Sequence, residues 1–437
     1  MKYKIFTYGC QMNIHDSEVI AGVLEKAGYE PSETLKDTDV VVLNTCCIRE
    51  NAERKVYGRI AQLKYFKQRN PNFTIAISGC MVQQPHVVEY ISKKLPYVDI
   101  LFSIKNVNKL PELIEECRRI DSITAALAGN SDLAENLEVK HTSSIKAWVP
   151  ITYGCNNYCT YCVVPYVRGR EVSRLPEDIL REVKTLADEG FMEINLLGQN
   201  VNSYGKNLDK PFDFPELLRK INEIEGIERI RFITSHPKDL SDELVLAMKE
   251  CEKVCEHIHL PVQSGSSRIL KKMNRHYSRE HYIELVNKLK DAIPNISITT
   301  DIIVGFPGET EEDFLDTLDL VKTIEFDSAF TFIYSKRIGT PAAQMEDQID
   351  DEIKKERLKR LMELQDSITK RKNNELVGTV QEVLVEGESK NDAQKLSGRT
   401  RTNKLVNFVG PKELIGHLAD VKITESHTWC LIGEAVN

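Results

Sequence analysis

The sequence predicts an α/β protein of three domains: an N-terminal α/β domain with a parallel sheet, a central partial (β/α)6 barrel and a small C-terminal all-β barrel. The length of 437 residues favours about three domains, because single domains usually have roughly 100–200 residues. Through most of the chain, runs of β-branched and aromatic residues alternate with amphipathic helical patterns, which is typical of parallel α/β folds. The C-terminal part instead shows short β-like runs separated by Gly and Asn, the pattern of a small β-barrel.

The N-terminal domain, residues 1–125, is predicted from three strand–helix pairs. Its strands are rich in β-branched or aromatic residues, and an amphipathic helical pattern follows each of them. The strands are predicted at residues 3–8, 39–44 and 73–78, and the helices at residues 16–27, 50–69 and 85–95. The polar segment 126–145 has no clear hydrophobic period and is predicted to be a linker.

Each predicted strand of this domain runs into a cysteine: Cys10, Cys46 or Cys80. In open α/β sheets, the loops at the carboxyl ends of parallel strands gather along one edge, so three thiols far apart in sequence are expected to converge there. The alternative is that they are core residues, because free cysteine commonly packs inside proteins. Cys47 lies beside Cys46, so the pattern leaves open which of these two thiols takes part.

The central domain, residues 146–374, repeats the strand–helix alternation six times. Six successive βα units predict an incomplete (β/α) barrel, whose functional residues are expected at the C-terminal ends of its strands. The predicted strands have the sequences WVPITY, EINLLG, RIRFIT, EHIHLP, SITTDIIV and SAFTFIY. A charged helix at residues 350–375, with leucines at helical spacing, is expected to bridge to the C-terminal barrel at residues 375–437.

Composition and charge narrow the class of protein. Hydrophobic residues at 41% and charged residues at 28% are ordinary globular usage. No apolar run is long enough for a membrane helix, and the start MKYKIFTYGCQMN lacks the apolar stretch of a secretory signal, so a cytoplasmic location without membrane contact is expected. Eleven cysteines are too few for a disulfide scaffold of this length and favour metal binding or catalysis. A net charge of -8 requires any contact with RNA to use local basic patches.

The strongest motif is the cysteine loop that follows the first barrel strand. Cys155, Cys159 and Cys162 have the spacing C-x3-C-x2-C. Three thiolates in one tight loop suit a [4Fe–4S] cluster, in which one iron is left without a protein ligand and is open to a small molecule. The alternative is structural zinc, but a closed zinc site takes four ligands, and no fourth ligand lies nearby in the sequence.

The cysteine loop resembles that of the radical S-adenosylmethionine (SAM) enzymes, and long phrases of the chain resemble the methylthiotransferases, most closely the MiaB-type branch that acts on tRNA. The resemblance covers nearly the whole chain, including YGCQMN around Cys10, NTC at Cys46, GCM around Cys80 and a C-terminal segment similar to the TRAM RNA-binding barrel. The other phrases are YGCNNYCTYCVVPYVRGREVSR, LLGQNVNSYG, TSHPKDLSDEL, HLPVQSGSSRILKKMNR and TDIIVGFPGETEEDF.

The resemblance implies two [4Fe–4S] clusters and SAM as cofactors. Cys155, Cys159 and Cys162 would bind the SAM-binding cluster, at which SAM is cleaved to methionine and a 5′-deoxyadenosyl radical. Cys10, Cys46 and Cys80 would bind an auxiliary cluster; Cys46 is chosen over Cys47 because it fits the NTC phrase. The implied reaction converts N6-dimethylallyladenosine at position 37 of tRNA to its 2-methylthio derivative. No side chain is expected to act as catalytic acid or base, because an unactivated aromatic C–H has no acidic proton and the hard step belongs to the cofactor.

Further residues are predicted to contact SAM or RNA. Polar groups after barrel strands stand where such barrels collect functional residues, Gly305 begins a GFPGE turn after the fifth strand, and arginines after the cysteine loop suit a carboxylate or a phosphate. The predicted cofactor-binding residues are Gln199, Asn200, Ser235, Gln263, Ser264, Gly305, Arg168 and Arg170, and His236 follows Ser235. Loop-stabilising or solvated roles are the alternatives. A basic strip in the C-terminal barrel suits RNA phosphates; it comprises Lys395, Arg399, Arg401 and Lys404.

Two other functions remain open from the residues alone. One is a methylthiotransferase with a different target, either threonylcarbamoyladenosine of tRNA or an aspartate of a ribosomal protein. The other is a noncatalytic, metal-containing RNA-binding protein. The expected partners are tRNA, an external electron donor such as flavodoxin or ferredoxin, and iron–sulfur and sulfur supply proteins, and the protein is expected to be a monomer.

Overall fold

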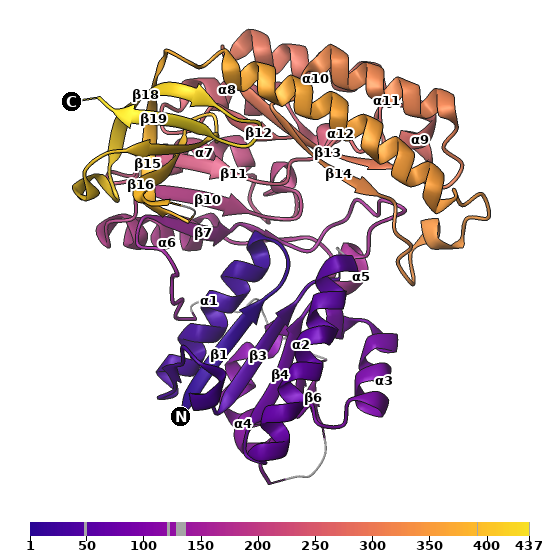
Figure 1. Cartoon of the computed structure of the whole chain (residues 1–437), viewed down its shortest axis with the longest axis vertical. Coiled ribbons are helices and arrows are strands. Elements are labelled where there is room, and N and C mark those ends of the chain that lie inside the picture. Colours follow the sequence, from indigo (N-terminus) through magenta and orange to yellow (C-terminus); the bar gives the residue numbers. More distant parts are fainter. Residues whose placement is uncertain (48–49, 120–122, 128–136, 391, 437) are drawn as a thin grey trace. The chain divides into compact units, whose positions relative to one another are not determined.

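The computed structural model describes residues 1–47, 50–119, 123–127, 137–390 and 392–436 (Figure 1). The chain forms two compact units. The first consists of Met1–Thr142 and Val163–Arg170, and the second consists of Ser143–Cys162 and Glu171–Asn437. The segment Val163–Arg170, which contains α5 (Val164–Val167), therefore belongs to the first unit although it directly follows the cysteine loop in sequence. Part of the predicted linker, residues 128–136, lies outside the described residues.

The first unit is built on a parallel sheet of strand order β2-β1-β3-β4-β5-β6. Parallel pairing places the carboxyl ends of all these strands at one edge of the sheet. The strands are β1 (Lys2–Thr7), β2 (Glu30–Pro31), β3 (Val40–Thr45), β4 (Thr74–Gly79), β5 (Ile100–Phe102) and β6 (Thr124–Ala126), and the helices are α1 (Gln11–Lys26), α2 (Glu50–Arg69), α3 (Pro85–Lys94) and α4 (Leu110–Cys117). The predicted parallel α/β domain is therefore confirmed.

The central strand β3 shows how the sequence specifies a sheet with helices on both faces. Val40 and Val42 pack with α1 and α4 on one face, and Val41 and Leu43 pack with α2 and α3 on the other. Because successive strand residues point to opposite faces, a strand covered by helices on both sides is apolar at every position. All six residues of β3 are buried: the apolar run Val40–Leu43 forms core on both faces, and the polar residues Asn44 and Thr45 follow at its carboxyl end.

The first helix begins earlier than the predicted residues 16–27. α1 starts at Gln11, directly after Cys10, and Cys10 caps it without a side-chain hydrogen bond. The carbonyl oxygen of Cys10 accepts from the amide nitrogens of Asn13 and Ile14, at 2.9 and 3.2 Å. The helix thus begins five residues before the predicted start, without a side-chain cap to mark its first residue. Cys10 consequently lies at the N-terminal end of α1.

The second unit contains the predicted partial barrel. Its six strands form two parallel sheets, β11-β10-β7 and β12-β13-β14, which a parallel bridge between Ile230 and Val254 links. The barrel strands are β7 (Lys146–Pro150), β10 (Glu193–Leu197), β11 (Arg229–Phe232), β12 (His257–His259), β13 (Ser297–Val304) and β14 (Ser328–Ile333), and the short strands β8 (Thr152–Tyr153) and β9 (Val172–Ser173) pair antiparallel. The helices around it are α6 (Pro176–Asp188), α7 (Phe214–Asn222), α8 (Asp242–Glu250), α9 (Ser267–Lys272), α10 (Arg279–Ala292) and α11 (Glu311–Ile324).

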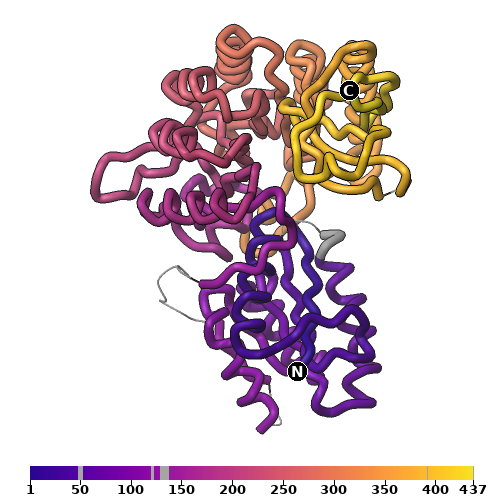
Figure 2. The backbone as a smooth tube through the Cα atoms, turned by 90° about the vertical axis from the view of Figure 1, so that its left-hand side faces the viewer, coloured from indigo at the N-terminus to yellow at the C-terminus, as the bar shows by residue number. Residues whose placement is uncertain are grey.

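The charged helix and the C-terminal barrel complete the second unit. α12 (Asp351–Asn374) packs on β14 and reaches β18, so it bridges the two barrels as predicted. Figure 2 shows the yellow C-terminal strands beside the orange helix segment. The C-terminal barrel is closed in the order β15-β16-β17-β19-β18, with strands β15 (Val380–Ser389), β16 (Asp392–Thr400), β17 (Leu405–Val409), β18 (Leu418–Ser426) and β19 (Leu431–Ala435). In the described part of the chain, no helix has the length and apolar character needed to cross a membrane.

Two buried arginines of β11 join the C-terminal barrel to the partial barrel. Arg229 donates to the Glu382 carboxylate at 2.7 Å and to the Arg399 carbonyl at 2.7 Å. Arg231 donates to the Thr400 carbonyl at 2.7 Å and to the Glu193 carboxylate at 2.8 Å. Both guanidinium groups are almost fully buried, so their N–H groups need protein acceptors, and the C-terminal barrel supplies most of those named.

Replacing Arg231 with alanine is expected to lower the free energy of unfolding by about 3–5 kcal/mol, because it leaves the buried Glu193 carboxylate without its cation. Chemical denaturation followed by circular dichroism measures the change. The matched control is Arg219→Ala, since the partly exposed ion pairs of Arg219 with Glu243 and Glu250 contribute only about 0–1 kcal/mol. Equal losses in the two variants would show that the buried Arg231–Glu193 pair contributes no more to stability than a partly exposed pair does.

Candidate functional site

The three strand-end cysteines of the first unit lie in neighbouring loops. β1, β3 and β4 are adjacent in the sheet; Cys46 and Cys80 directly follow β3 and β4, and Cys10 follows β1 after two residues. The amide nitrogen of Cys80 donates to the Thr45 carbonyl at 2.9 Å. A Cβ on Gly9 would lie 2.6 Å from the Cβ of Cys46, so the Cys10 and Cys46 loops are in direct contact. The structure thus brings the three loops together at one sheet edge.

A buried asparagine pair joins the Cys10 and Cys46 loops. Asn13 donates to the Asn44 side-chain oxygen at 3.1 Å and to the Thr45 carbonyl at 3.0 Å, and Asn44 donates back to the Asn13 carbonyl at 2.8 Å. The Cys10 thiol lies 3.4 Å from the Asn13 side-chain oxygen. Both asparagines are fully buried, so this satisfied polar network fixes the relative position of the loops. It explains why Asn occurs in both the YGCQMN and the NTC phrase.

Gly79, the residue before Cys80, has no room for a side chain. Its φ is +93°, and a Cβ there would lie 2.2 Å from the Thr45 carbonyl oxygen. Gly79→Ala is therefore expected to cost about 1–3 kcal/mol of stability and to displace the Cys80 loop, which lowers the iron bound per chain. Iron analysis after anaerobic reconstitution measures this. Gly28→Ala is the control, because Gly28 also has positive φ, at +84°, but faces open space; equal iron loss in both would contradict the expectation.

Cys47 lies within the same buried group as Cys80. Both thiols are nearly fully buried and pack with Val163. A hydrogen bond from Cys47, together with the nearby Arg168, lowers the pKa of Cys80 to about 6 against the opposing effect of burial. The same hydrogen bond, together with burial, raises the pKa of Cys47. Cys80 is therefore the thiolate of this pair, whereas the choice between Cys46 and Cys47 as ligand stays a prediction.

The two predicted arginines after the cysteine loop lie in the first unit. Arg168 donates to the sulfur of Cys80 at 3.2 Å and to the carboxylate of Asp16 at 2.8 Å. Its side chain is 11% exposed, whereas Arg170 is exposed. The guanidinium of Arg168 thus contacts a cysteine and an aspartate of its own unit. These contacts do not test the predicted contact of Arg168 with SAM, which stays a prediction.

The cysteine loop of the second unit has a constrained backbone. Gly154 and Tyr158 have φ values of +72° and +46°, and the amide nitrogen of Cys162 donates to the Cys159 carbonyl at 2.9 Å. The amide nitrogen of Thr160 donates to the Met273 carbonyl at 3.0 Å, which ties the loop to the end of α9. Cys155 and Cys159 are buried, and burial raises the pKa of Cys155 to about 11. The loop places three cysteines within one compact turn.

The donor chemistry of both cysteine sets fits an iron–sulfur cube. In the part of the chain that the structure describes, no three His, Cys, Asp or Glu side chains converge on one point where a single metal ion would bind. A [4Fe–4S] cluster makes a different demand, because each protein thiolate binds a different iron. Three thiols on adjacent loops, and three in one turn, meet that demand in number and type.

Buried polar atoms without protein partners gather at the strand ends of the second unit. They are the Asn200 side-chain oxygen, both amide atoms of Asn202, the Ser235 hydroxyl and the Nε2 atom of His236. Burial keeps His236 neutral by lowering its pKa, so Nε2 can donate or accept according to tautomer. Because buried polar atoms normally have partners, this group fits a polar ligand such as SAM. Asn202 was missed by the sequence prediction, although it lies in the quoted phrase LLGQNVNSYG.

The other predicted polar residues are placed differently. Ser264 is fully buried, and its hydroxyl accepts from the Ser266 amide at 3.2 Å, where it supports the start of α9. Gln263 has a φ of +73° and continues the parallel pairing beyond β12 through a bridge to Ile302. Gln199 is half-buried after β10. Ser264 therefore supports its own loop, and the contacts of Gln199, Gln263 and Ser264 with SAM stay predictions.

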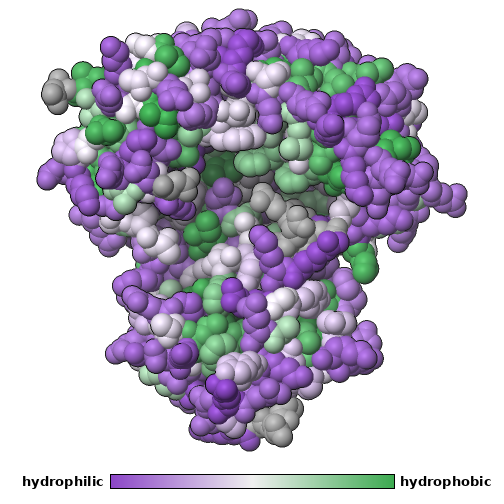
Figure 3. Space-filling model, in the orientation of Figure 1, coloured by the Kyte–Doolittle hydropathy of each residue, from purple (hydrophilic) through white to green (hydrophobic). Residues whose placement is uncertain are grey.

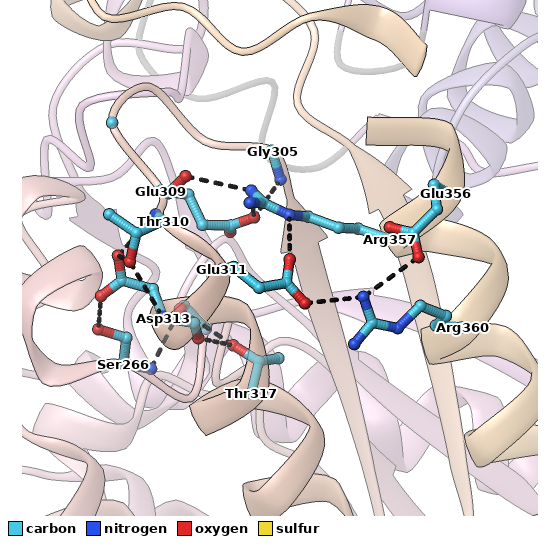
Figure 4. Close-up of polar contacts among 12 residues, drawn as sticks. Ser266, Gly305, Glu309, Thr310, Glu311, Asp313, Thr317, Glu356, Arg357 and Arg360 are labelled. Carbon is cyan, nitrogen blue, oxygen red and sulfur yellow. Dashed lines mark hydrogen bonds and ion pairs between the residues drawn. The ribbon is translucent and has the colours of Figure 1, made fainter. Parts of the chain in front are cut away.

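The GFPGE turn is held by a buried ion pair (Figure 4). The Glu309 carboxylate accepts from the Gly305 amide at 2.8 Å and from Arg357 at 2.8 Å. A Cβ on Gly305 would lie 2.3 Å from the side chain of Lys354, so only glycine allows α12 to approach this closely. Thr310 and Asp313 then form a capping box that begins α11. The turn is rigid, and the amide of Gly305 is already used within it.

The concave face of sheet β12-β13-β14 exposes an aromatic ring. Phe330 is 54% exposed, and its ring centroid lies 6.0 Å from that of His259. His259 in turn lies 3.0 Å from the Thr299 hydroxyl and 3.4 Å from the Asp301 carboxylate. Figure 3 shows that most of the visible surface is hydrophilic and that hydrophobic residues lie in smaller patches. An exposed aromatic face beside polar groups is suited to stacking a nucleobase.

The predicted basic strip of the C-terminal barrel is largely paired with carboxylates. Arg401 donates to Glu256 at 2.7 Å, and Lys404 contacts Asp327 at 3.2 Å and is only 14% exposed. These two side chains fasten the C-terminal barrel to the partial barrel. Lys395 and Arg399 are more exposed, at 33% and 37%. Contact of the strip with RNA stays a prediction, and the exposed pair is better placed for it.

Three family models match successive parts of the chain. The uncharacterized protein family UPF0004 matches residues 2–103, the radical SAM superfamily matches residues 149–321, and the TRAM domain matches residues 374–436. The last two matches cover the partial barrel and the closed C-terminal barrel.

Curated relatives match the chain over its whole length. A tRNA-2-methylthio-N(6)-dimethylallyladenosine synthase of Thermoanaerobacter sp. (strain X514) is 60% identical and covers 99% of this chain and 92% of its own. The synthase of the same name from Natranaerobius thermophilus is 55% identical and covers 99% and 96%. Among solved structures, the radical SAM methyltransferase TsrM from Kitasatospora setae is similar, with a TM-score of 0.57 at 12% identity, covering 84% of this chain and 89% of that one. That likeness concerns the fold alone.

Proposed function

Because this chain belongs to the family of the tRNA-2-methylthio-N(6)-dimethylallyladenosine synthases, we propose that its two cysteine sets hold two [4Fe–4S] clusters that act together on one adenosine of tRNA. The chain is a radical SAM methylthiotransferase that converts N6-dimethylallyladenosine in tRNA to the 2-methylthio derivative. We place the target at position 37 and the reaction in the cytoplasm. Membership of the radical SAM superfamily implies SAM and a [4Fe–4S] cluster.

The six cysteines divide between the clusters by unit. Cys155, Cys159 and Cys162 would hold the SAM-binding cluster, and Cys10, Cys46 and Cys80 would hold the auxiliary cluster, with one iron of each cube left without a protein ligand. When bound, the clusters and SAM supply one-electron chemistry that activates an aromatic C–H bond and delivers a sulfur atom and a methyl group. The single observation that supports this most strongly is the presence of two separate three-cysteine sets, one on adjacent strand ends and one in a single turn.

The polypeptide itself binds SAM and the tRNA, orients them and shields the site from water. Asn200, Asn202, Ser235 and His236 offer buried polar atoms that fit the amino-acid and ribose groups of SAM. Phe330 offers an exposed ring for a base of the tRNA. No side-chain acid or base is assigned, since the C–H bond to be broken has no acidic proton. The protein side chains therefore contribute by holding SAM and the target base in the correct geometry.

Other components complete the reaction. The chemistry consumes electrons, so we expect an external donor such as flavodoxin or ferredoxin, together with proteins that supply sulfur and iron–sulfur clusters. Lys395 and Arg399 are proposed to contact RNA phosphates, which add affinity without reading the base sequence. The protein is proposed to work as a monomer.

An anaerobic assay with SAM, a reductant and tRNA that carries dimethylallyladenosine tests the function. We expect 2-methylthio-N6-dimethylallyladenosine in the nucleoside digest by mass spectrometry. Matched tRNA carrying threonylcarbamoyladenosine, and ribosomal protein, are controls for the two other methylthiotransferase targets. A methylthio product on either control, with none on the dimethylallyl tRNA, would refute the assignment of the substrate.

A further inference from the structure

Each cysteine set is contacted by one buried arginine, and we infer that these arginines, Arg168 and Arg275, are positioning residues that set the reduction potentials of the two clusters. Arg168 donates an N–H to the sulfur of Cys80 at 3.2 Å, and Arg275 donates an N–H to the sulfur of Cys159 at 3.4 Å. The inference rests on the proposed assignment of Cys80 and Cys159 as cluster ligands. It goes beyond that assignment by giving each cluster its own electrostatic partner.

Arg168 reaches Cys80 as part of an ion pair. Besides the sulfur, its guanidinium contacts the Asp16 carboxylate at 2.8 Å, and the Asp16 side chain is only 4% exposed. Asp16 belongs to α1, the helix that begins directly after Cys10. The positive charge beside Cys80 is therefore partly neutralised by a buried carboxylate, and the geometry of the guanidinium is fixed from two sides.

Arg275 reaches Cys159 without a carboxylate. It donates to the Pro261 carbonyl at 2.7 Å and to the Tyr277 hydroxyl at 3.0 Å, and the Tyr277 hydroxyl donates to the Val262 carbonyl at 2.8 Å. Arg275 is 4% exposed. Among the described residues that it contacts, only Cys159 would be anionic, as a thiolate ligand of the cluster. A buried cation whose only anionic neighbour is a thiolate is costly unless that thiolate, or the cluster that it binds, balances it.

A cation and an N–H donor at a ligand sulfur favour the more negative, reduced state of a cluster. Hydrogen bonds to the sulfurs and the net charge of the site are established determinants of iron–sulfur potentials, and groups behind the ligands tune a metal site generally. Loss of either arginine charge should therefore shift the potential of its own cluster to a more negative value. The shift should be larger for Arg275, whose charge no carboxylate compensates. Loss of the Asp16 charge should shift the auxiliary cluster in the opposite direction.

The test measures each cluster separately in the full-length protein. A background with Cys155, Cys159 and Cys162 changed to alanine keeps the auxiliary cluster, and a background with Cys10, Cys46 and Cys80 changed to alanine keeps the SAM-binding cluster. Potentials are read from redox titrations followed by electron paramagnetic resonance, with iron content measured on the same samples. Arg168→Gln and Arg275→Gln are introduced into both backgrounds, so that each variant is the control for the other. Arg219→Gln, at an exposed ion pair, is a further control.

We expect Arg168→Gln to lower only the auxiliary potential and Arg275→Gln to lower only the SAM-binding potential, by a larger shift. Asp16→Asn is expected to raise the auxiliary potential. Arg168→Lys and Arg275→Lys, which keep the charge and guard against misfolding of the Gln variants, should remain closer to the parent potentials than the Gln variants do. Potentials unchanged by the Gln variants, or shifted equally by Gln and Lys, would overturn the inference while the clusters remain. Backgrounds that bind no cluster at all would instead refute the proposed cluster ligands.

Discussion

Replacing Cys155, Cys159 and Cys162 together with alanine is expected to abolish reductive cleavage of SAM, so that 5′-deoxyadenosine falls to the level of a reaction without protein. These are the only cysteines in the turn that follows β8, and without thiolates an iron–sulfur cube has no ligands there. The cleavage needs an electron at a site where SAM is bound, and no side chain can supply one. Chromatography of an anaerobic reaction with dithionite measures 5′-deoxyadenosine directly.

The matched control for this variant is Cys251→Ala. Cys251 is also buried in the second unit, at the end of α8, but lies outside both cysteine sets. It should retain the cleavage activity and the full iron content. A triple variant that still cleaves SAM reductively would show that the radical chemistry does not depend on this turn.

Replacing Cys10, Cys46 and Cys80 together is expected to separate the two halves of the reaction. The SAM-binding turn lies in the other compact unit and uses none of these residues, so 5′-deoxyadenosine should still form. The 2-methylthio nucleoside should be absent, because the auxiliary cluster is the proposed site of the transferred sulfur. Mass spectrometry of digested tRNA and chromatography of the same reaction give both readings.

Single variants within this set decide between the neighbouring thiols. Cys46→Ala is expected to remove the methylthio product, whereas Cys47→Ala should retain most of it, because Cys46 is the assigned ligand and Cys47 hydrogen-bonds to Cys80. The reverse result would transfer the ligand role to Cys47. A triple variant that still forms the methylthio nucleoside would contradict the auxiliary site altogether.

The fold could be predicted from the sequence because each domain has a clear local pattern of strands and helices. The β-branched residues at 39–44 predicted the strand β3, and the leucines of α12 predicted a bridging helix. The predicted start of α1 at residue 16 was wrong: the helix begins at Gln11, and Cys10 caps it without the polar side-chain hydrogen bond that commonly marks a helix start. The meeting of the three cysteine loops at one sheet edge was predictable, because parallel pairing places the carboxyl ends of the strands at the same edge.

The roles of charged side chains were less predictable because they depend on contacts distant in sequence. Arg168 was expected to meet a carboxylate or a phosphate, and it does contact a carboxylate, but that of Asp16, 152 positions away. Arg401 was predicted to contact RNA, which stays a prediction, and its guanidinium pairs with Glu256, 145 positions away. No local pattern distinguishes an arginine that binds nucleic acid from one that joins two domains. The phrase LLGQNVNSYG identified the loop that contains Asn202. The residue itself was identified only from its buried amide atoms, which have no hydrogen-bond partner among the described residues.

The most direct test of two separately held clusters is the iron and sulfide content of reconstituted protein. The wild-type chain should bind about eight irons, each triple-alanine variant about four, and the variant with all six cysteines replaced close to none. The proteins that bind iron should give Mössbauer spectra of the [4Fe–4S] type. A wild-type content of about four irons, or loss of all iron on replacing either set alone, would contradict the assignment of one cluster to each set.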